Sequence, residues 1–237
     1  MEGFFILLFL VIGIGLIFVW RGIQAEKARR ESLRIWAKSK GFTYSDNKDR
    51  GIPRTYEALD VLRAGDDRYC FNTMRGSIGD LPLLITDHHY ETHSTDSKGN
   101  RQTHHHYFTL FVIDLPFRFP TEIRIRPEHF FDKIAGAIGF DDIDFESSEF
   151  SRKFHVKSKN RKLAYDIIHS RMMELLLEHR SIKPTIELDH RFLCIYRSGR
   201  LKAQDYEKWL DFTERFYAHF PEFVTQALQS QNKPTRL

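Results

Sequence analysis

The fold is decided by one stretch of the chain, LPLLITDHHYETHSTDSKGNRQTHHHYFTLFVIDL (residues 81–115). It predicts two long β-strands, residues 81–93 and 103–115, because both halves are rich in β-branched and aromatic residues. The polar residues 94–102 join the strands, with the turn itself at residues 97–100. Near their base both strands are apolar on both faces, and near the turn they are polar. We therefore expect a hairpin that is rooted in the core and projects its end into water.

Histidines are concentrated in this hairpin. It holds six of the chain's twelve: His88, His89 and His93 on the first strand, and His104, His105 and His106 on the second. Neutral imidazole is the commonest metal ligand in proteins, and residues opposite each other on one sheet face have Cβ atoms about 5 Å apart. One interpretation is therefore a zinc or copper site with ligands drawn from His89, Glu91, His93, His104, His105 and His106. The alternatives are a solvated tip without metal, and a pH sensor, since clustered imidazoles repel one another once protonated.

The length of the turn decides which of these side chains share a face. A three-residue turn pairs Asp96 with Asn100. It places His89, Glu91, His93 and His105 on one face and His88, His104 and His106 on the other. A two-residue turn at residues 98–99 instead groups His89, Glu91 and His93 with His104 and His106. The sequence leaves both registers open.

The beginning of the chain predicts a membrane anchor, residues 1–22. Residues 4–20 are an uninterrupted uncharged and almost wholly apolar run, about 25 Å long as a helix. Basic residues follow the run and none precedes it, which predicts an N-terminus outside and a C-terminal part in the cytoplasm. A cleaved signal peptide is the weaker alternative, because the start is acidic and the cleavage site a poor match. We expect a single-pass protein of the bacterial inner membrane.

Residues 23–41 predict a basic helix next to the membrane. The basic residues after the run are Arg21, Lys27, Arg29, Arg30, Arg34, Lys38 and Lys40. Such a segment attracts anionic lipid headgroups by about 1 kcal/mol per basic side chain. The sequence shows no basic stripe with stacking aromatics deeper in the domain, so nucleic acid is not an expected partner. The expected partners are the lipid bilayer, its headgroups and a protein at the membrane.

Residues 42–229 predict an α+β domain with a mixed, mainly antiparallel sheet, the projecting hairpin and packed helices, followed by a polar tail at 230–237. A boundary between two subdomains is one option near residue 140. Besides the hairpin, we expect strands at 42–45, 59–62, 69–74, 121–126, 185–188 and 192–197, a loop at 47–54, and helices at 26–40, 128–138, 161–179, 203–220 and 222–229. In the strand at 121–126, Ile123 and Ile125 should point inward and Arg124 outward.

The two cysteines, Cys70 and Cys194, lie in apolar surroundings without a CxxC spacing. They predict buried, reduced thiols, which agrees with a cytoplasmic domain.

Residues 145–156 carry the pattern FESxEFxRxFxV. Together with Trp36-Ala37, Gly41-Phe42 and Gly51-Ile52-Pro53, this pattern resembles a family of bacterial membrane-anchored proteins with a cytoplasmic α+β domain and no established activity. The resemblance covers most of residues 30–220. It implies the architecture and supplies no catalytic residue or cofactor.

The sequence contains no catalytic motif. The HxExH spelling at residues 89–93 differs from the helical HExxH of zinc proteases, because it lies on a predicted strand. The chain is therefore expected to be an interaction or scaffold module at the membrane, without a cofactor, whose exposed hairpin contacts the partner. The alternative is a membrane-tethered metal-binding enzyme or sensor that uses the histidine-rich hairpin.

Overall fold

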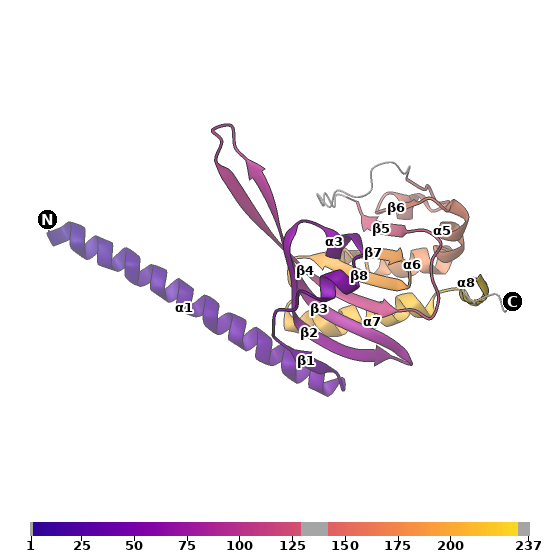
Figure 1. Ribbon diagram of the computed structural model, residues 1–237, viewed down its shortest axis with the longest axis horizontal. Coiled ribbons are helices and arrows are strands. Elements are labelled where there is room, and N and C mark those ends of the chain that lie inside the picture. Colours follow the sequence, from indigo (N-terminus) through magenta and orange to yellow (C-terminus); the bar gives the residue numbers. More distant parts are fainter. Residues whose placement is uncertain (1, 129–141, 232–237) are drawn as a thin grey trace.

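The protein has an α+β fold built on one eight-stranded antiparallel sheet, in the strand order β1-β2-β3-β4-β8-β7-β5-β6 (Figure 1). The computed structural model describes the backbone of residues 2–128 and 142–231, and side chains from residue 10 onward. The strands are β1 (Thr43–Ser45), β2 (Asp66–Ile78), β3 (Leu81–Thr95), β4 (Arg101–Asp114), β5 (Ile123–Pro127), β6 (Phe154–Ser158), β7 (Thr185–Asp189) and β8 (Phe192–Ser198). Every pair of neighbouring strands is antiparallel.

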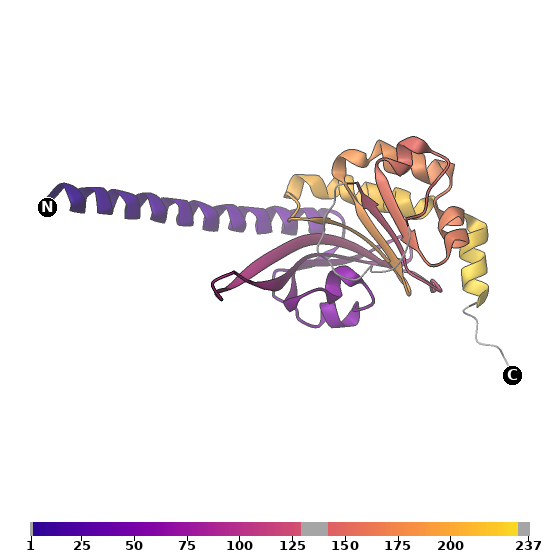
Figure 2. The same cartoon turned by 90° about the horizontal axis from the view of Figure 1, so that it is seen from above.

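The main core lies between one face of the sheet and a layer of helices (Figure 2). The helices are α1 (Glu2–Ser39), α4 (Ser148–Ser151), α5 (Arg161–Ile167), α6 (Ser170–Glu178), α7 (Tyr206–Ala218) and α8 (Glu222–Gln231), with 3-10 turns at Arg180–Ile182 and Ala203–Asp205. The sheet contributes alternate apolar residues such as Ile85 and Phe111, and α7 contributes Trp209 and Phe216. This arrangement follows from the period of two along each strand and the apolar stripe along each helix.

A second, smaller core covers the opposite face of the sheet. It joins Leu84, Phe108 and Val112 of the central strands to the short helices α2 (Ile52–Thr55) and α3 (Asp60–Arg63). The central hairpin is therefore apolar on both faces because both are covered, as its sequence predicts.

Helix α1 runs without interruption through the predicted anchor and the predicted basic helix. Its C-terminal part lies on the domain, with Leu33 and Ala37 fully buried, and its N-terminal part extends away from it (Figure 1). Gly41 follows the helix with φ at +73°, the left-handed conformation that ends many helices.

No helix among the described residues combines the length and apolar character needed to cross a bilayer. Of the anchor predicted at residues 1–22, residues 1–9 lie outside the described side chains.

Several local predictions were wrong. Residues 59–62 are not a strand: Asp60 opens the helix α3, where it forms ion pairs with Arg63 and Arg124. The loop predicted at 47–54 contains the start of α2. The helix predicted over 161–179 is two helices, because the chain turns at Ile168 and the His169 ring bonds the carbonyl oxygen of His219 at 3.0 Å. The boundary near 140, the helix predicted at 128–138 apart from its first residue, and most of the tail at 230–237 lie outside the described residues.

The position of Arg124 also differs from its prediction. Ile123 and Ile125 are fully buried as predicted, but Arg124 between them is only 2% exposed instead of pointing into water. Its guanidinium contacts Asp60 and Glu122, and its Nε lies 3.8 Å from Glu187. The alternation along the strand correctly predicts that Arg124 lies on the face opposite to Ile123 and Ile125. That face is buried at this position, whereas the prediction assumed that it was exposed to water.

Candidate functional site

The hairpin of β3 and β4 projects beyond the sheet, and its turn has three residues. The Asp96 amide donates to the Asn100 carbonyl oxygen at 3.0 Å, and the Asp96 carboxylate accepts from the amides of Lys98 and Asn100 at 2.9 and 2.8 Å. Gly99 has φ at +83°. Of the two registers that the sequence left open, the structure therefore has the one that pairs Asp96 with Asn100.

This register brings three of the six metal-ligand candidates together. Glu91 pairs with His105 across the strands, and His89 precedes Glu91 by two residues on the same face. The His89 Nε2 atom lies 3.1 Å from His105 Nδ1, which in turn lies 3.3 Å from Glu91 Oε1. The three ligand atoms all lie within 4.8 Å of one another.

Aromatic rings hold the His89 side chain in place. It stacks against Tyr69, with ring centroids 4.5 Å apart, and packs against Tyr107 at 4.9 Å. His89 is 2% exposed, and this burial lowers the pKa of its imidazole. Its Nδ1 lies 3.3 Å from the carbonyl oxygen of Asp67.

The other three candidates point to different partners. His93 Nδ1 lies 3.1 Å from the Thr103 hydroxyl, on the cluster's face of the hairpin but nearer the tip. His104 and His106 lie on the opposite face, where their Nε2 atoms contact the hydroxyls of Ser94 and Thr92 at 2.8 Å each. The structure thus separates them from the group of His89, Glu91 and His105.

His88 belongs to the second core instead of the tip. Its Nδ1 lies 3.2 Å from the carbonyl oxygen of Tyr69 and 3.7 Å from the Cys70 sulfur. Complete burial lowers the pKa of its imidazole to about 4. It is a neutral core residue, and it does not face the ligand cluster because it lies on the other face of the strand.

Sequence reasoning missed the residue that joins the hairpin to helix α1. Asp87 is fully buried at the base of β3, on the same face as His89 and Glu91. Arg29 of α1 reaches it with Nη1 at 2.8 Å and Nη2 at 3.2 Å. The only signal in the sequence is the acid itself, because a carboxylate in the apolar base of a strand requires a buried partner.

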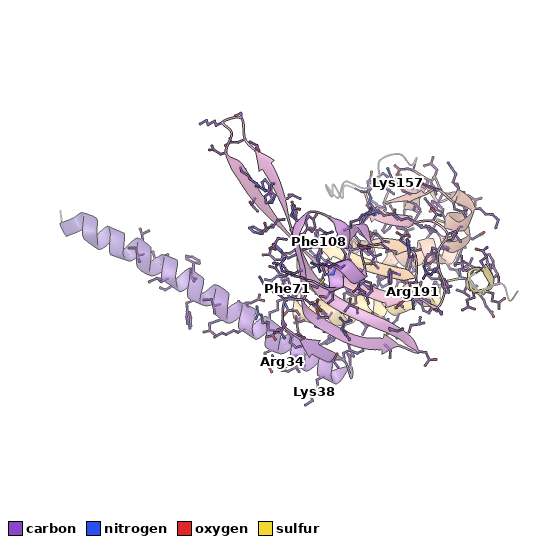
Figure 3. The ribbon with its side chains drawn as sticks, in the orientation of Figure 1. Arg34, Lys38, Phe71, Phe108, Lys157 and Arg191 are labelled. Atoms are coloured by element: carbon purple, nitrogen blue, oxygen red, sulfur yellow. The ribbon has the colours of Figure 1, made fainter. Side chains whose placement is uncertain are left out.

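Cations and aromatic rings surround the root of the hairpin. Phe71 pairs with Asp87, on the face toward α1, and Phe108 belongs to the opposite core. Figure 3 labels both residues. The Arg200 guanidinium carbon lies 5.9 Å from the Phe71 ring and 5.8 Å from the Tyr107 ring. Arg200 also binds Glu26 of α1 at 2.9 Å, so this surface continues from the hairpin onto the helix.

No family model matches the chain, and no curated protein sequence matches it. The family resemblance that rests partly on the pattern at residues 145–156 is therefore not confirmed by either comparison. Among solved structures, the chain is similar to the crystal structure of the mycobacterial trehalose monomycolate transport factor A, TtfA, with a TM-score of 0.61 and 12% identity. The similarity covers 81% of this chain and 96% of that one, and it shows a shared fold.

Proposed function

We propose that this chain is an interaction module held at the inner membrane of a bacterial cell by helix α1, with its N-terminus outside and its folded part in the cytoplasm. The observation that carries the proposal is the rigid attachment of α1. Arg29 is bound to the buried Asp87, and its Nε and Nη2 also donate to the carbonyl oxygen of Leu201 at 3.0 and 2.9 Å. A helix fixed in this way orients the whole domain, whereas a flexible linker would leave it free to turn.

A second set of contacts fixes the C-terminal end of α1. Trp36 Nε1 donates to Glu207 of α7 at 3.1 Å, and Lys40 Nζ lies 2.6 Å from the same carboxylate. Contacts at both Arg29 and Trp36 hold the helix at two points about two turns apart.

The hairpin and the free part of α1 extend from the same side of the domain (Figures 1 and 2). If residues 4–20 are inserted in the bilayer, the hairpin tip points toward the membrane and meets partners there. The tip is polar, and Lys98 and Arg101 are exposed. Confinement to the surface raises the effective concentration of the domain for such partners.

Anionic lipid headgroups remain a proposed partner of α1. Fewer of its basic side chains are available to bind them than the sequence predicts, because several form ion pairs within the protein. Arg29 is engaged with Asp87, and Lys40 with Glu207. Arg30 pairs with Glu26, and Arg34 with Glu31. Electrostatic attraction to the bilayer would therefore depend chiefly on Arg21, Lys27 and Lys38.

Two further observations are compatible with a binding module. The neighbour of shared fold is named a transport factor. The His89–Glu91–His105 group is open to water, with the side chains of His105 and Glu91 54% and 20% exposed. The membrane-tethered metal-binding enzyme or sensor that uses the same group stays the alternative.

Membrane attachment is tested by alkaline carbonate extraction of bacterial membranes. The full chain should stay with the membrane pellet, and a chain that starts at residue 23, which keeps Arg29, should be released. Release of the full chain would overturn the proposed anchor.

Partner contact is tested by shortening the hairpin. Replacing residues 93–103 with Asn-Gly leaves the hydrogen-bonded pair of Thr92 and His104 flanking a two-residue turn, so the strand register is kept. This variant should fold and stay on the membrane, but it should lose the crosslinked adducts that the full chain forms in membranes. Unchanged adducts would show that the tip is not the contact surface.

A further inference from the structure

The spacing of three side chains on the hairpin matches the requirements of a metal ion. Ligand atoms that bind Zn²⁺ at 2.0–2.1 Å with tetrahedral angles are about 3.3 Å apart. The distance from His89 Nε2 to His105 Nδ1 is 3.1 Å, and that from His105 Nδ1 to Glu91 Oε1 is 3.3 Å. The third pair, His89 and Glu91, has ligand atoms within 4.8 Å of each other, so side-chain rotations could bring all three around one ion.

The hydrogen bonding of His89 leaves the correct nitrogen available. A carbonyl oxygen only accepts hydrogen bonds, so Nδ1, which faces the Asp67 carbonyl at 3.3 Å, carries the hydrogen. Nε2 then presents its lone pair toward His105 and Glu91. Metal-binding histidines have this same arrangement, because the hydrogen bond of the second nitrogen orients the ring. Stacking on Tyr69 holds the ring still.

The Nδ1 atom of His105 faces two acceptors at once. The Nε2 lone pair of His89 and the carboxylate of Glu91 both lie within 3.3 Å of this one nitrogen. A single N–H cannot donate fully to both. A cation at their common centre would bind all three groups together.

We propose that His89, Glu91 and His105 bind one Zn²⁺ ion on the face of the hairpin that carries Asp87. Two imidazole nitrogens and one carboxylate oxygen suit zinc, and three protein ligands leave a fourth position for water or for a side chain of another protein. The ion would crosslink β3 to β4 above the point where Arg29 joins the hairpin to α1. This inference does not depend on the membrane anchor or on the partner proposed above.

The test is a titration of the full chain in detergent micelles with Zn²⁺ in competition with a chromogenic chelator. We expect one equivalent to bind. His105→Ala and Glu91→Gln should each weaken the affinity at least about tenfold, because each removes a ligand. His104→Ala and His106→Ala are matched controls on the opposite face and should stay within about twofold. Co²⁺ in place of Zn²⁺ should give the visible absorption of a four-coordinate ion.

His89 is buried, so substitution is confined to Glu91 and His105, and circular dichroism must match the full chain for each variant. Absence of saturable one-to-one binding would overturn the proposal. Equal losses in His104→Ala and His105→Ala would overturn it as well, because binding would then belong to the histidines collectively. Either failure leaves the carbonate and crosslinking tests unaffected.

Discussion

The guanidinium of Arg29 lies 2.8 Å from the carboxylate of Asp87, and this contact joins the N-terminal helix to the base of the central hairpin. The Asp87 side chain is fully buried and that of Arg29 is 14% exposed. Asn72 and Thr109 also donate to the carboxylate, at 2.9 and 2.7 Å. A buried carboxylate with this many donors fixes the angle between α1 and the strand that carries His89 and Glu91.

Arg29→Ala should destabilise the protein by about 3 kcal/mol, because it leaves a buried charge without its ionic partner. The matched control is Arg34→Ala on the same helix, where Arg34 and Glu31 are both more than half exposed. That change should cost about 0.5 kcal/mol or less. Chemical unfolding in detergent, followed by tryptophan fluorescence, measures both values. Equal costs would show that the buried pair does not hold the helix, and Asp87→Asn should rescue part of the loss if it does.

Gly65→Ala should distort the hairpin at Glu91. Gly65 has φ at +65°, and a Cβ atom there would lie 2.4 Å from the Glu91 carbonyl oxygen. We expect a loss of about 2 kcal/mol or more from the strained backbone and the clash together. Gly99→Ala is the control, since Gly99 also has positive φ but a Cβ atom there would meet nothing within 4 Å. Similar unfolding free energies for the two variants would contradict the close approach of Gly65 to the hairpin.

Some of this architecture follows from the sequence, and the rest depends on residues distant along the chain. The hairpin, its polar tip and the burial of Ile123 and Ile125 are local patterns of period two, and they were predicted correctly. The burial of Arg124 was not, because its partner Asp60 lies 64 residues away on a helix that the sequence did not predict. The composition of the turn allowed two registers, and the hydrogen bonds of Asp96 select one. The meeting of His89, Glu91 and His105 follows from that choice.

Glu187 should make the stability of the protein depend on pH. Complete burial raises the pKa of this carboxyl from its ordinary 4.5 to about 7. The folded chain then binds a proton more tightly than the unfolded chain, so the contribution of Glu187 is fully present below about pH 4.5 and is lost as the pH rises through 7. The loss approaches about 3 kcal/mol by pH 8.

Glu187→Gln should remove this dependence, because the amide does not titrate and its oxygen can still accept the hydrogen bond that Tyr196 donates at 2.7 Å. Unfolding free energies at pH 5 and pH 8 give the comparison. Glu174→Gln, at an exposed position of α6, is the control. Its unfolding free energy should change between pH 5 and pH 8 by the same amount as that of the unaltered chain. A pH dependence that survives in Glu187→Gln would assign it to other groups.

Neither cysteine should react in the folded protein. Cys70 and Cys194 are both fully buried, and burial raises the pKa of each thiol, which suppresses the reactive thiolate. A maleimide should therefore leave the native chain unlabelled and label both thiols once the chain is unfolded. Rapid labelling of the native chain would show that one of the two cores opens.

Because the native thiols should not react with maleimide, the labelling of an added cysteine reports the orientation of the domain. Ser97 is exposed at the hairpin turn and Ser230 is exposed on α8, at the other end of the domain. If the folded part lies in the cytoplasm, a membrane-impermeant maleimide should label Ser97→Cys and Ser230→Cys only after the cells are opened. Labelling of both in intact cells would place the domain outside the inner membrane. Because the hairpin and the free part of α1 extend from the same side, Ser97→Cys should also be labelled more slowly than Ser230→Cys in opened membranes, and equally fast after detergent is added.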